Sequence, residues 1–80
     1  MYIGEVQKTV DARGLSCPGP ILNSKKAIMK LKIGQVLEIL TTDPGSKKDI
    51  PAWANLTGQE FITTEDFENE GFRFIIKRLK

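Results

Sequence analysis

Glycine and proline fall in short clusters that divide the 80-residue sequence into segments, and the hydrophobic pattern changes from one segment to the next. Segments rich in β-forming residues first alternate with segments of helical periodicity, and two strand-like segments close the chain. The expected order is β-α-β-α-β-β. A small set of elements in this order shares one core most readily as a two-layer α/β sandwich. In this architecture, two helices lie on one face of a four-stranded mixed sheet. We expect residues 1–80 to form a single domain, because a chain of this length has room for one core.

The expected strands are Glu5–Val10, Gln35–Thr41, Glu60–Thr64 and Phe72–Arg78, and the expected helices are Pro18–Lys32 and Asp49–Thr57. The second strand is apolar on both alternations, as in a strand near the middle of a sheet. The last strand alternates, with two phenylalanines and an isoleucine on one side. The residues expected on one face of the first helix are Ile21, Ser24, Ile28 and Leu31.

The start of the second helix has two interpretations. Ser46 with Asp49 resembles a capping box, but a helix that begins there contains Pro51, which would lose a backbone hydrogen bond. Asp49 as the N-cap places this proline in the first turn, so we expect the helix to begin there. The residues at helical spacing in it are Ile50, Trp53 and Leu56, and we expect Trp53 to belong to the core.

The composition excludes several classes of protein. The chain has one cysteine and no histidine, which excludes an internal disulfide, a Cys-x-x-Cys redox pair and the Cys–His and Ser–His–Asp arrangements. The net charge of +2 is too small to indicate nucleic-acid binding, and the chain has no aromatic-rich RNP-type strand and no GXXG loop. No secretion signal and no apolar run of about 20 residues is present. We therefore expect a cytoplasmic protein that does not contact the membrane.

Cys17 is the one side chain capable of strong nucleophilic chemistry. As a free cysteine it has an alternative role as a small buried hydrophobic residue. Its position between a loop and the first helix favours function, because the helix N-terminus lowers the pKa of a thiol. Pro18 and Pro20 stiffen the loop, and Gly19 has no side chain to obstruct a partner. Without a histidine base or a second thiol, the chemistry that remains is persulfide carriage. A lone thiol suits this role, because a neighbouring cysteine would attack the persulfide, release the sulfur and leave a disulfide.

Residues 11–20, with the sequence Asp-Ala-Arg-Gly-Leu-Ser-Cys-Pro-Gly-Pro, resemble the Cys-Pro-x-Pro signature of the TusA/SirA-like sulfur-carrier family. Residues 42–46 and 49–53 resemble its second conserved stretch. The resemblance implies that Cys17 accepts a persulfide from a cysteine desulfurase or a rhodanese-type protein. The sulfur then passes to an acceptor protein, for tRNA thiolation, cofactor assembly or sulfur oxidation. Many members have Gly-His-Glu where this chain has Gly58-Gln59-Glu60.

Two charged residues near the cysteine each have a functional and a structural interpretation. Arg13 could stabilise a thiolate or persulfide anion, or it could pair with Asp11 at the end of the strand. Asp43 follows the expected central strand, at the edge where ligand sites gather, and could orient the loop or a partner. It could equally cap the N–H groups of a local turn.

The first helix also offers a surface for partners. Leu22 and Met29 share a side of it and form either an apolar docking patch or part of a broad core face. Lys25 and Lys26 are either solvated or steer acidic proteins to this helix. The main expectation is a sulfurtransferase that acts as a persulfide carrier and needs no cofactor beyond the covalent persulfide. The alternative is a regulatory or adaptor module that binds a protein through this basic helix.

Overall fold

The computed structural model describes residues 4–15, 19–67 and 71–80. Its elements are β1 (Lys8–Ala12), α1 (Gly19–Ile28), β2 (Val36–Thr41), α2 (Ser46–Thr57), β3 (Glu60–Phe67) and β4 (Gly71–Lys77). This order confirms the expected β-α-β-α-β-β arrangement.

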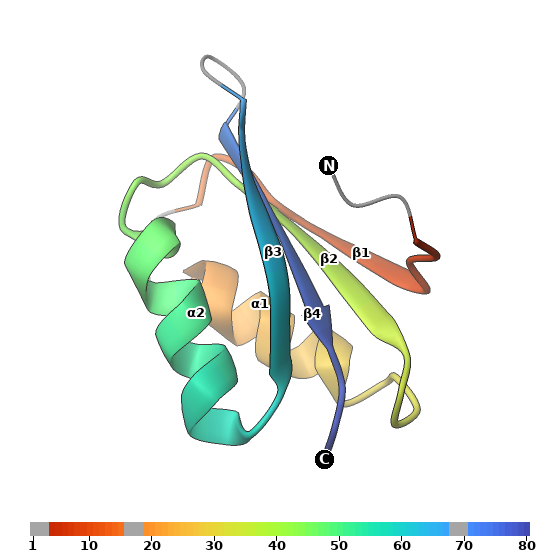
Figure 1. The fold of residues 1–80 in the computed structure, drawn as a ribbon. Helices are drawn as coiled ribbons and strands as arrows, with labels where there is room; N and C mark the ends of the chain where they lie inside the picture. The colour runs from red at the N-terminus through yellow and green to blue at the C-terminus, as the bar shows by residue number, and fades with distance from the viewer. Residues whose placement is uncertain (1–3, 16–18, 68–70) are drawn as a thin grey trace.

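The strands form one mixed sheet in the order β1-β2-β4-β3. β1 and β2 are parallel, and β4 is antiparallel to both of its neighbours, so β3 also runs parallel to β2. The connections through α1 and α2 therefore both join parallel strands, and both step in the same direction across the sheet. Crossovers of one hand that step in one direction place their helices on the same face. Figure 1 shows α1 and α2 together on that face, as the sequence predicts.

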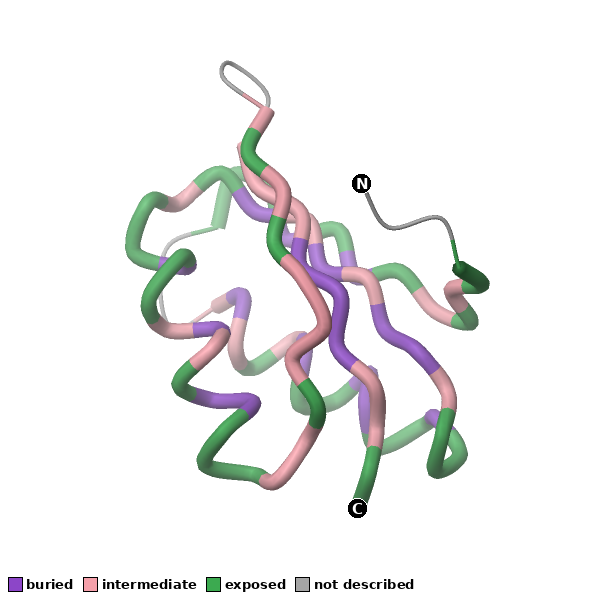
Figure 2. The backbone as a smooth tube through the Cα atoms, viewed as in Figure 1, coloured by how far each residue is buried: buried purple, intermediate pink, exposed green. Residues whose placement is uncertain are grey.

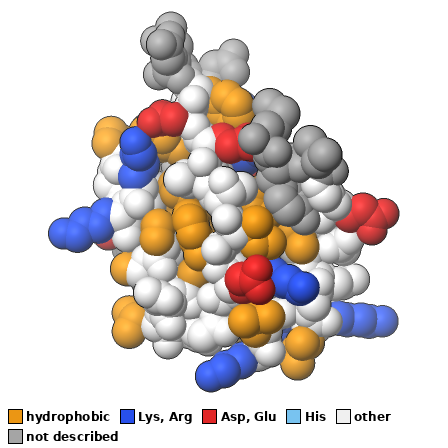
Figure 3. All heavy atoms as spheres, viewed as in Figure 1, with side chains coloured by type: hydrophobic (Ala, Val, Ile, Leu, Met, Phe, Trp, Pro, Cys, Tyr) orange, Lys and Arg blue, Asp and Glu red, His pale blue; other side chains and the backbone are white. Residues whose placement is uncertain are grey.

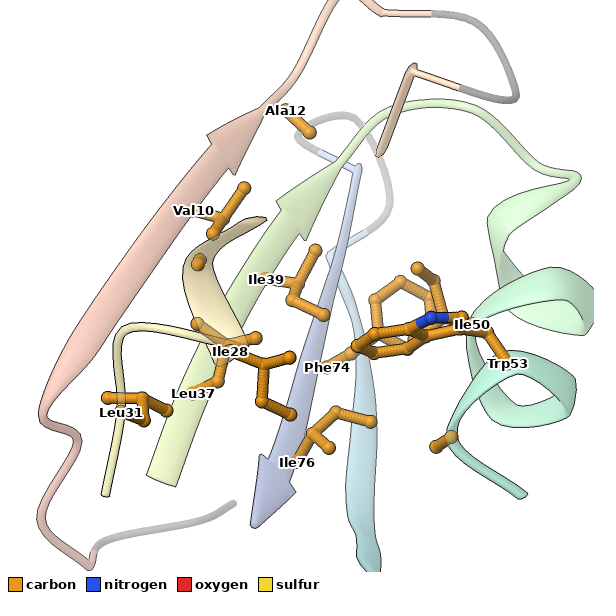
Figure 4. Packing of buried hydrophobic residues seen from close by; sticks show 12 residues of the cluster. Val10, Ala12, Ile28, Leu31, Leu37, Ile39, Ile50, Trp53, Phe74 and Ile76 are labelled. Atoms are coloured by element: carbon orange, nitrogen blue, oxygen red, sulfur yellow. The ribbon is translucent and has the colours of Figure 1, made fainter. Parts of the chain in front are cut away.

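The core lies between the sheet and the two helices, and β2 and β4 contribute its centre (Figures 2 and 4). Leu37 and Ile39 of β2 and Phe74 and Ile76 of β4 are completely buried. The other buried members are Val10, Ala12, Ala27, Ile28, Leu31, Ile50, Trp53 and Ala54. Trp53 is therefore a core residue, as expected. The central position predicted for the strand over Gln35–Thr41 is also confirmed.

The opposite face of the sheet carries a polar network that reaches all four strands. The guanidinium of Arg73 donates to Glu38, and its Nη1 donates to Glu65 Oε1 at 3.1 Å. The hydroxyl of Thr9 donates to Glu38 Oε1 at 2.8 Å. The bond to Glu38 above all raises the pKa of Arg73, against the opposing effect of partial burial. Cross-strand pairs of this kind stabilise a sheet and help to define its register.

The first strand and the first helix have boundaries that differ from the prediction. β1 extends over Lys8–Ala12 rather than Glu5–Val10, because it pairs with β2 from Leu37 to Thr41. α1 ends at Ile28 rather than Lys32. The chain tightens after it, where the N–H groups of residues 30 and 31 bond three residues back. The guanidinium of Arg78, beyond the end of β4, donates to the carbonyls of Met29 and Leu31.

The expected N-cap of the second helix is wrong. α2 begins at Ser46, has Gly45 as its N-cap and contains Pro51. The proline costs the helix the hydrogen bond that its N–H would give to the carbonyl four residues earlier. Tertiary contacts hold the first turn in place: Ser46 is buried, and Lys47 Nζ lies 2.8 Å from Asp66 Oδ2 and 5.4 Å from the centre of the Phe72 ring.

Two further differences concern α2 and β3. Leu56 is 88% exposed, whereas Ile50, Trp53 and Ala54 are buried. The buried face of α2 thus includes Ala54 and does not include Leu56. β3 extends to Phe67 instead of Thr64, because it stays paired with β4 as far as Gly71.

Candidate functional site

Cys17 and Pro18 lie outside the described residues, so the expected N-cap position and accessibility of the thiol stay predictions. The site is defined here by the residues on both sides of this segment. Cys17 precedes Gly19 by two residues in the sequence.

Four element ends meet at this end of the sandwich. β1 and β2 are parallel and finish side by side, with Ala12 paired to Thr41. The helix that follows each strand starts at the same end, before returning along the sheet (Figure 1). In α/β folds this edge, beyond the carboxyl ends of parallel strands, is where functional sites gather. We call it the site end.

The segment before Cys17 is fixed to β1 and β2. The Gly14 N–H donates to the Thr42 hydroxyl at 2.9 Å, and the Leu15 N–H donates to the Ala12 carbonyl at 3.2 Å. Gly14 has a φ of +84°, which favours glycine. The bond to Thr42 joins the two sequence stretches that resemble the sulfur-carrier family, although they lie 28 residues apart.

The segment after Cys17 is fixed in the core. Pro20 is fully buried, and the Ser24 hydroxyl donates to its carbonyl at 2.7 Å. A Cβ atom at Gly19 would lie 3.2 Å from the Cβ of Leu15. Gly19 thus allows Leu15 to pack closely against the start of α1. That it also leaves room for a partner protein stays a prediction. Both ends of the cysteine segment are anchored.

Arg13 forms the structural ion pair that the sequence offered as one alternative. Its Nε and Nη2 donate to the two carboxylate oxygens of Asp11, each at 2.9 Å. These bonds, together with one from the Arg13 N–H, lower the pKa of Asp11 to about 2. Both side chains stay about half exposed, at 51% and 55%. The pair therefore holds a guanidinium at the surface of the site end, and its role toward sulfur stays a prediction.

Asp43 has the local capping contacts that were its structural alternative. Its Oδ1 accepts from the Gly45 N–H at 3.2 Å, and its carbonyl accepts from the Ser46 N–H at 3.0 Å. The half-buried side chain thus shapes the turn that leads into α2. A further role toward a partner stays a prediction.

The partner-binding residues expected on α1 face solvent. Leu22 is 52% exposed and Met29, just after the helix, is 68% exposed. Lys25 and Lys26 are also exposed. Spacings of three, four and seven residues from Leu22 place all four on one side of the helix. The broad core face that was the alternative for the two apolar residues is wrong. We call these four residues the α1 outer face.

Three hydroxyl residues at the site end were not predicted from the sequence. Thr42 holds the backbone of Gly14, and Thr41 and Ser46 are buried. All three belong to the run from residue 41 to 46 in which only Asp43 was considered for function. The sequence does contain a signal for these residues: hydroxyl side chains follow one another at the end of an apolar strand, where buried residues are normally apolar.

Within the described ranges, neither helix has the length and apolarity needed to cross a membrane. The same residues contain no group of three acidic, cysteine or histidine side chains arranged to hold a metal ion. They also enclose no pocket. On the side of the molecule seen in Figure 3, acidic and basic side chains are interspersed.

Comparisons with known proteins show the family of this chain. The family model described as Sulfurtransferase TusA matches residues 8–78. The sulfur carrier protein TusA of Allochromatium vinosum is 42% identical over 76 residues, which are 95% of this chain and 99% of that protein. The putative sulfur carrier protein YrkF of Bacillus subtilis is 48% identical over 69 residues, which are 86% of this chain and 37% of that longer protein.

The crystal structure of a SirA-like protein from Desulfitobacterium hafniense has the same fold. It superimposes with a TM-score of 0.81 at 25% identity, over 92% of this chain and 100% of the other. The family match covers both stretches that the Gly14–Thr42 bond joins at the site end. The chain belongs to the TusA family of sulfur carriers.

Proposed function

We propose that this protein carries sulfur as a persulfide on Cys17. The Cys17 thiolate attacks the outer sulfur of a donor persulfide, R–S–SH. The donor S–S bond breaks as the new one forms, its electron pair leaves with the donor thiolate, and the proton stays on the transferred sulfur. An acceptor thiolate then attacks that sulfur and releases the Cys17 thiolate. Neither step needs an external oxidant or reductant.

The observation that carries this proposal is that a chain of the TusA family contains one thiol, and that this thiol lies in the stretch matched to the family. A lone thiol cannot attack its own persulfide from a neighbouring position. The absence of histidine in the sequence leaves no imidazole base for peptidase or acyl-transfer chemistry.

The surroundings of the cysteine segment suit a thiolate. The N-terminus of α1 directs its dipole toward an anion, although Pro20 supplies no N–H. The guanidinium of Arg13 adds a positive charge at the surface of the site end. Leu15 and Gly19, on either side of the cysteine segment, are both anchored.

The α1 outer face begins five residues after Cys17 and combines exposed apolar and basic side chains. It suits partner proteins with an apolar patch beside acidic groups, because opposite charges steer association. We propose a cysteine desulfurase or a rhodanese-type protein as the donor and a cysteine-containing protein as the acceptor. The free thiol requires a reducing compartment, which we propose is the cytoplasm.

Intact mass spectrometry tests the carrier. Incubation with a cysteine desulfurase and cysteine should add about 32 Da per transferred sulfur, in a form that dithiothreitol removes. Cys17→Ser should remain folded and gain no mass. An unmodified wild-type protein after incubation with an active donor would contradict the proposal.

The docking surface is tested separately. Lys25→Glu combined with Lys26→Glu should slow sulfur uptake, most strongly at low salt. Lys48→Glu combined with Lys77→Glu makes the same change in net charge on α2 and β4, outside the α1 outer face, and should have a smaller effect. Equal effects of the two pairs would show that net charge alone matters. An adaptor module would instead bind its partner equally well after Cys17→Ala and carry no sulfur.

A further inference from the structure

Exposed aliphatic side chains gather at the end of the sandwich opposite the site, which we call the far end. Leu56 is 88% exposed, Ile33 is 69% exposed and Leu79 is 45% exposed. They belong to the last turn of α2, the loop between α1 and β2, and the segment after β4. Figure 1 shows these three segments at the same end of the molecule. Single exposed aliphatic residues need no explanation, but several in one place indicate a surface that contacts another molecule.

Hydrogen bonds join the three segments. The segment after β4 lies between the other two. On one side, the Gly34 N–H donates to the Arg78 carbonyl at 2.7 Å. On the other side, the Leu79 N–H donates to Gln59 Oε1 at 2.7 Å, and the Gln59 N–H donates to the Ala54 carbonyl of α2 at 2.9 Å. The aliphatic side chains therefore stand on one connected backbone.

The far end is also the basic end of the molecule. Residues 29–35, 55–60 and 77–80 contain five lysine or arginine residues and one glutamate, a net side-chain charge of +4. This exceeds the net charge of +2 of the whole chain. At the site end, residues 11–15 and 42–49 contain three basic and three acidic residues. The two ends of one small sandwich thus differ in charge, and the positive end carries the exposed aliphatic residues.

These aliphatic and basic side chains form one mixed surface. In the lower part of Figure 3, hydrophobic and basic side chains lie next to one another. We define the far-end surface by six exposed residues: Lys30, Lys32, Ile33, Leu56, Leu79 and Lys80.

The composition of the far-end surface favours a lipid partner over a protein partner. Protein interfaces are typically enriched in aromatic residues and arginine and depleted in lysine. The six residues of this surface are three lysines and three aliphatic residues. At an anionic bilayer, aliphatic side chains enter the boundary between headgroups and acyl chains, and lysines are attracted by the negative surface potential.

We propose that the far-end surface docks on an anionic lipid bilayer. Ile33, Leu56 and Leu79 lie at the acyl boundary, and the three lysines contact the headgroup phosphates. The contact is peripheral and needs no apolar run along the sequence, because its aliphatic residues come from three segments. It departs from the sequence-based expectation of no membrane contact. In this orientation the site end points away from the bilayer, where partner proteins can reach it.

Vesicle flotation tests the electrostatic part of the proposal. The protein should bind vesicles of phosphatidylcholine with about 30% phosphatidylserine at low salt, and less at high salt. It should bind vesicles of phosphatidylcholine alone weakly. Lys30→Gln combined with Lys32→Gln should weaken binding to the anionic vesicles about twentyfold. The control pair, Lys25→Gln with Lys48→Gln, removes the same charge outside the far-end surface and should weaken binding less than about threefold.

Serine substitutions test the aliphatic part. Ile33→Ser and Leu79→Ser should each weaken vesicle binding about tenfold, because the apolar area that enters the bilayer is lost. Leu22→Ser, the matched control, changes a residue of the α1 outer face that is 52% exposed, and it should leave vesicle binding unchanged. The midpoints of urea unfolding should stay at the wild-type value, since all three side chains are exposed.

Three results would overturn the proposal. The first is wild-type protein that does not float with anionic vesicles at low salt. The second is an equal effect of the two lysine pairs, because net charge alone would then explain the adsorption. The third is binding to soluble polyglutamate without binding to vesicles, which would assign the far-end surface to an acidic protein. Sulfur uptake is measured without vesicles, so failure of this proposal and failure of the carrier function are distinguishable.

Discussion

The two ends of the sandwich differ in how completely their polar groups are paired. At the end opposite the site, where both helices finish, the hydrogen bonds close the structure. Arg78 donates to two carbonyls after α1, and Gln59 Oε1 accepts from the N–H groups of Leu79 and Lys80. Gly58 ends α2 in the left-handed conformation, with its N–H on the Asn55 carbonyl.

At the site end, the backbone is fixed just as firmly, but the buried hydroxyls of Thr41 and Ser46 are unpaired. Among the described residues, the two ends of one small core thus differ in the pairing of their buried polar groups. An unpaired buried hydroxyl lowers stability, because it loses its contact with water without compensation.

The largest effect on stability is expected from a glycine at the site end. A Cβ atom at Gly71 would lie 2.1 Å from the Thr41 carbonyl oxygen, and the φ of Gly71 is +103°. Gly71→Ala should therefore lower the free energy of unfolding by about 3 kcal/mol, measured in urea. Gly34, toward the other end, has a φ of +94° and open space around it. Gly34→Ala should cost only about 1 kcal/mol, from the backbone conformation. Equal losses would show that the site end is not tightly packed around Thr41.

A smaller effect is expected from the cap at the opposite end. Arg78→Ala removes donors to the carbonyls of Met29, Leu31 and Lys80. We expect a loss of about 1.5 kcal/mol in urea unfolding, with unchanged sulfur uptake per folded molecule. Arg78→Lys keeps the charge but not the planar set of donors, and should recover only part of the loss. A change in uptake would contradict the separation of the two ends.

The smallest effect concerns pH. The bonds from Arg13 lower the pKa of Asp11 to about 2 in the folded protein, from 3.8. A folded-state pKa below the unfolded value adds stability above pH 3.8, and this contribution is lost as the pH falls through about 2. The pair is exposed, so the effect on unfolding should be slight. Titration by NMR should place the Asp11 midpoint near pH 2, and Arg13→Gln should raise it. An unchanged midpoint in that variant would show that the ion pair does not form in solution.

Most of the fold could be predicted because the segments have distinct hydrophobic periods. The strand over Gln35–Thr41 is apolar on both sides, and this pattern placed it in the middle of the sheet. The start of α2 could not be predicted. The local rule against proline inside a helix was outweighed by burial of Ser46 and by the contacts of Lys47 with Asp66 and Phe72.

The candidate site was predictable only in part. Cys17 and the neighbouring prolines were selected from their residue types and spacing, and their role stays a prediction. Local pairs such as Arg13 with Asp11 were also found, as alternatives. The burial of Thr41 and Ser46 was not predicted, because a hydroxyl residue at the end of a strand is common, and being buried without a partner is a property of the packed core.

From the sequence alone came the order of elements, the two layers, the single nucleophile and the family that its neighbours resemble. These depend on side-chain chemistry and on spacing along the chain, which folding does not alter. Tertiary packing decided where each helix begins and ends, that Leu56 faces solvent, and which hydroxyls remain unpaired. The physical reason is that burial and hydrogen-bond pairing depend on residues distant in the chain, and local propensities of about 1 kcal/mol yield to them.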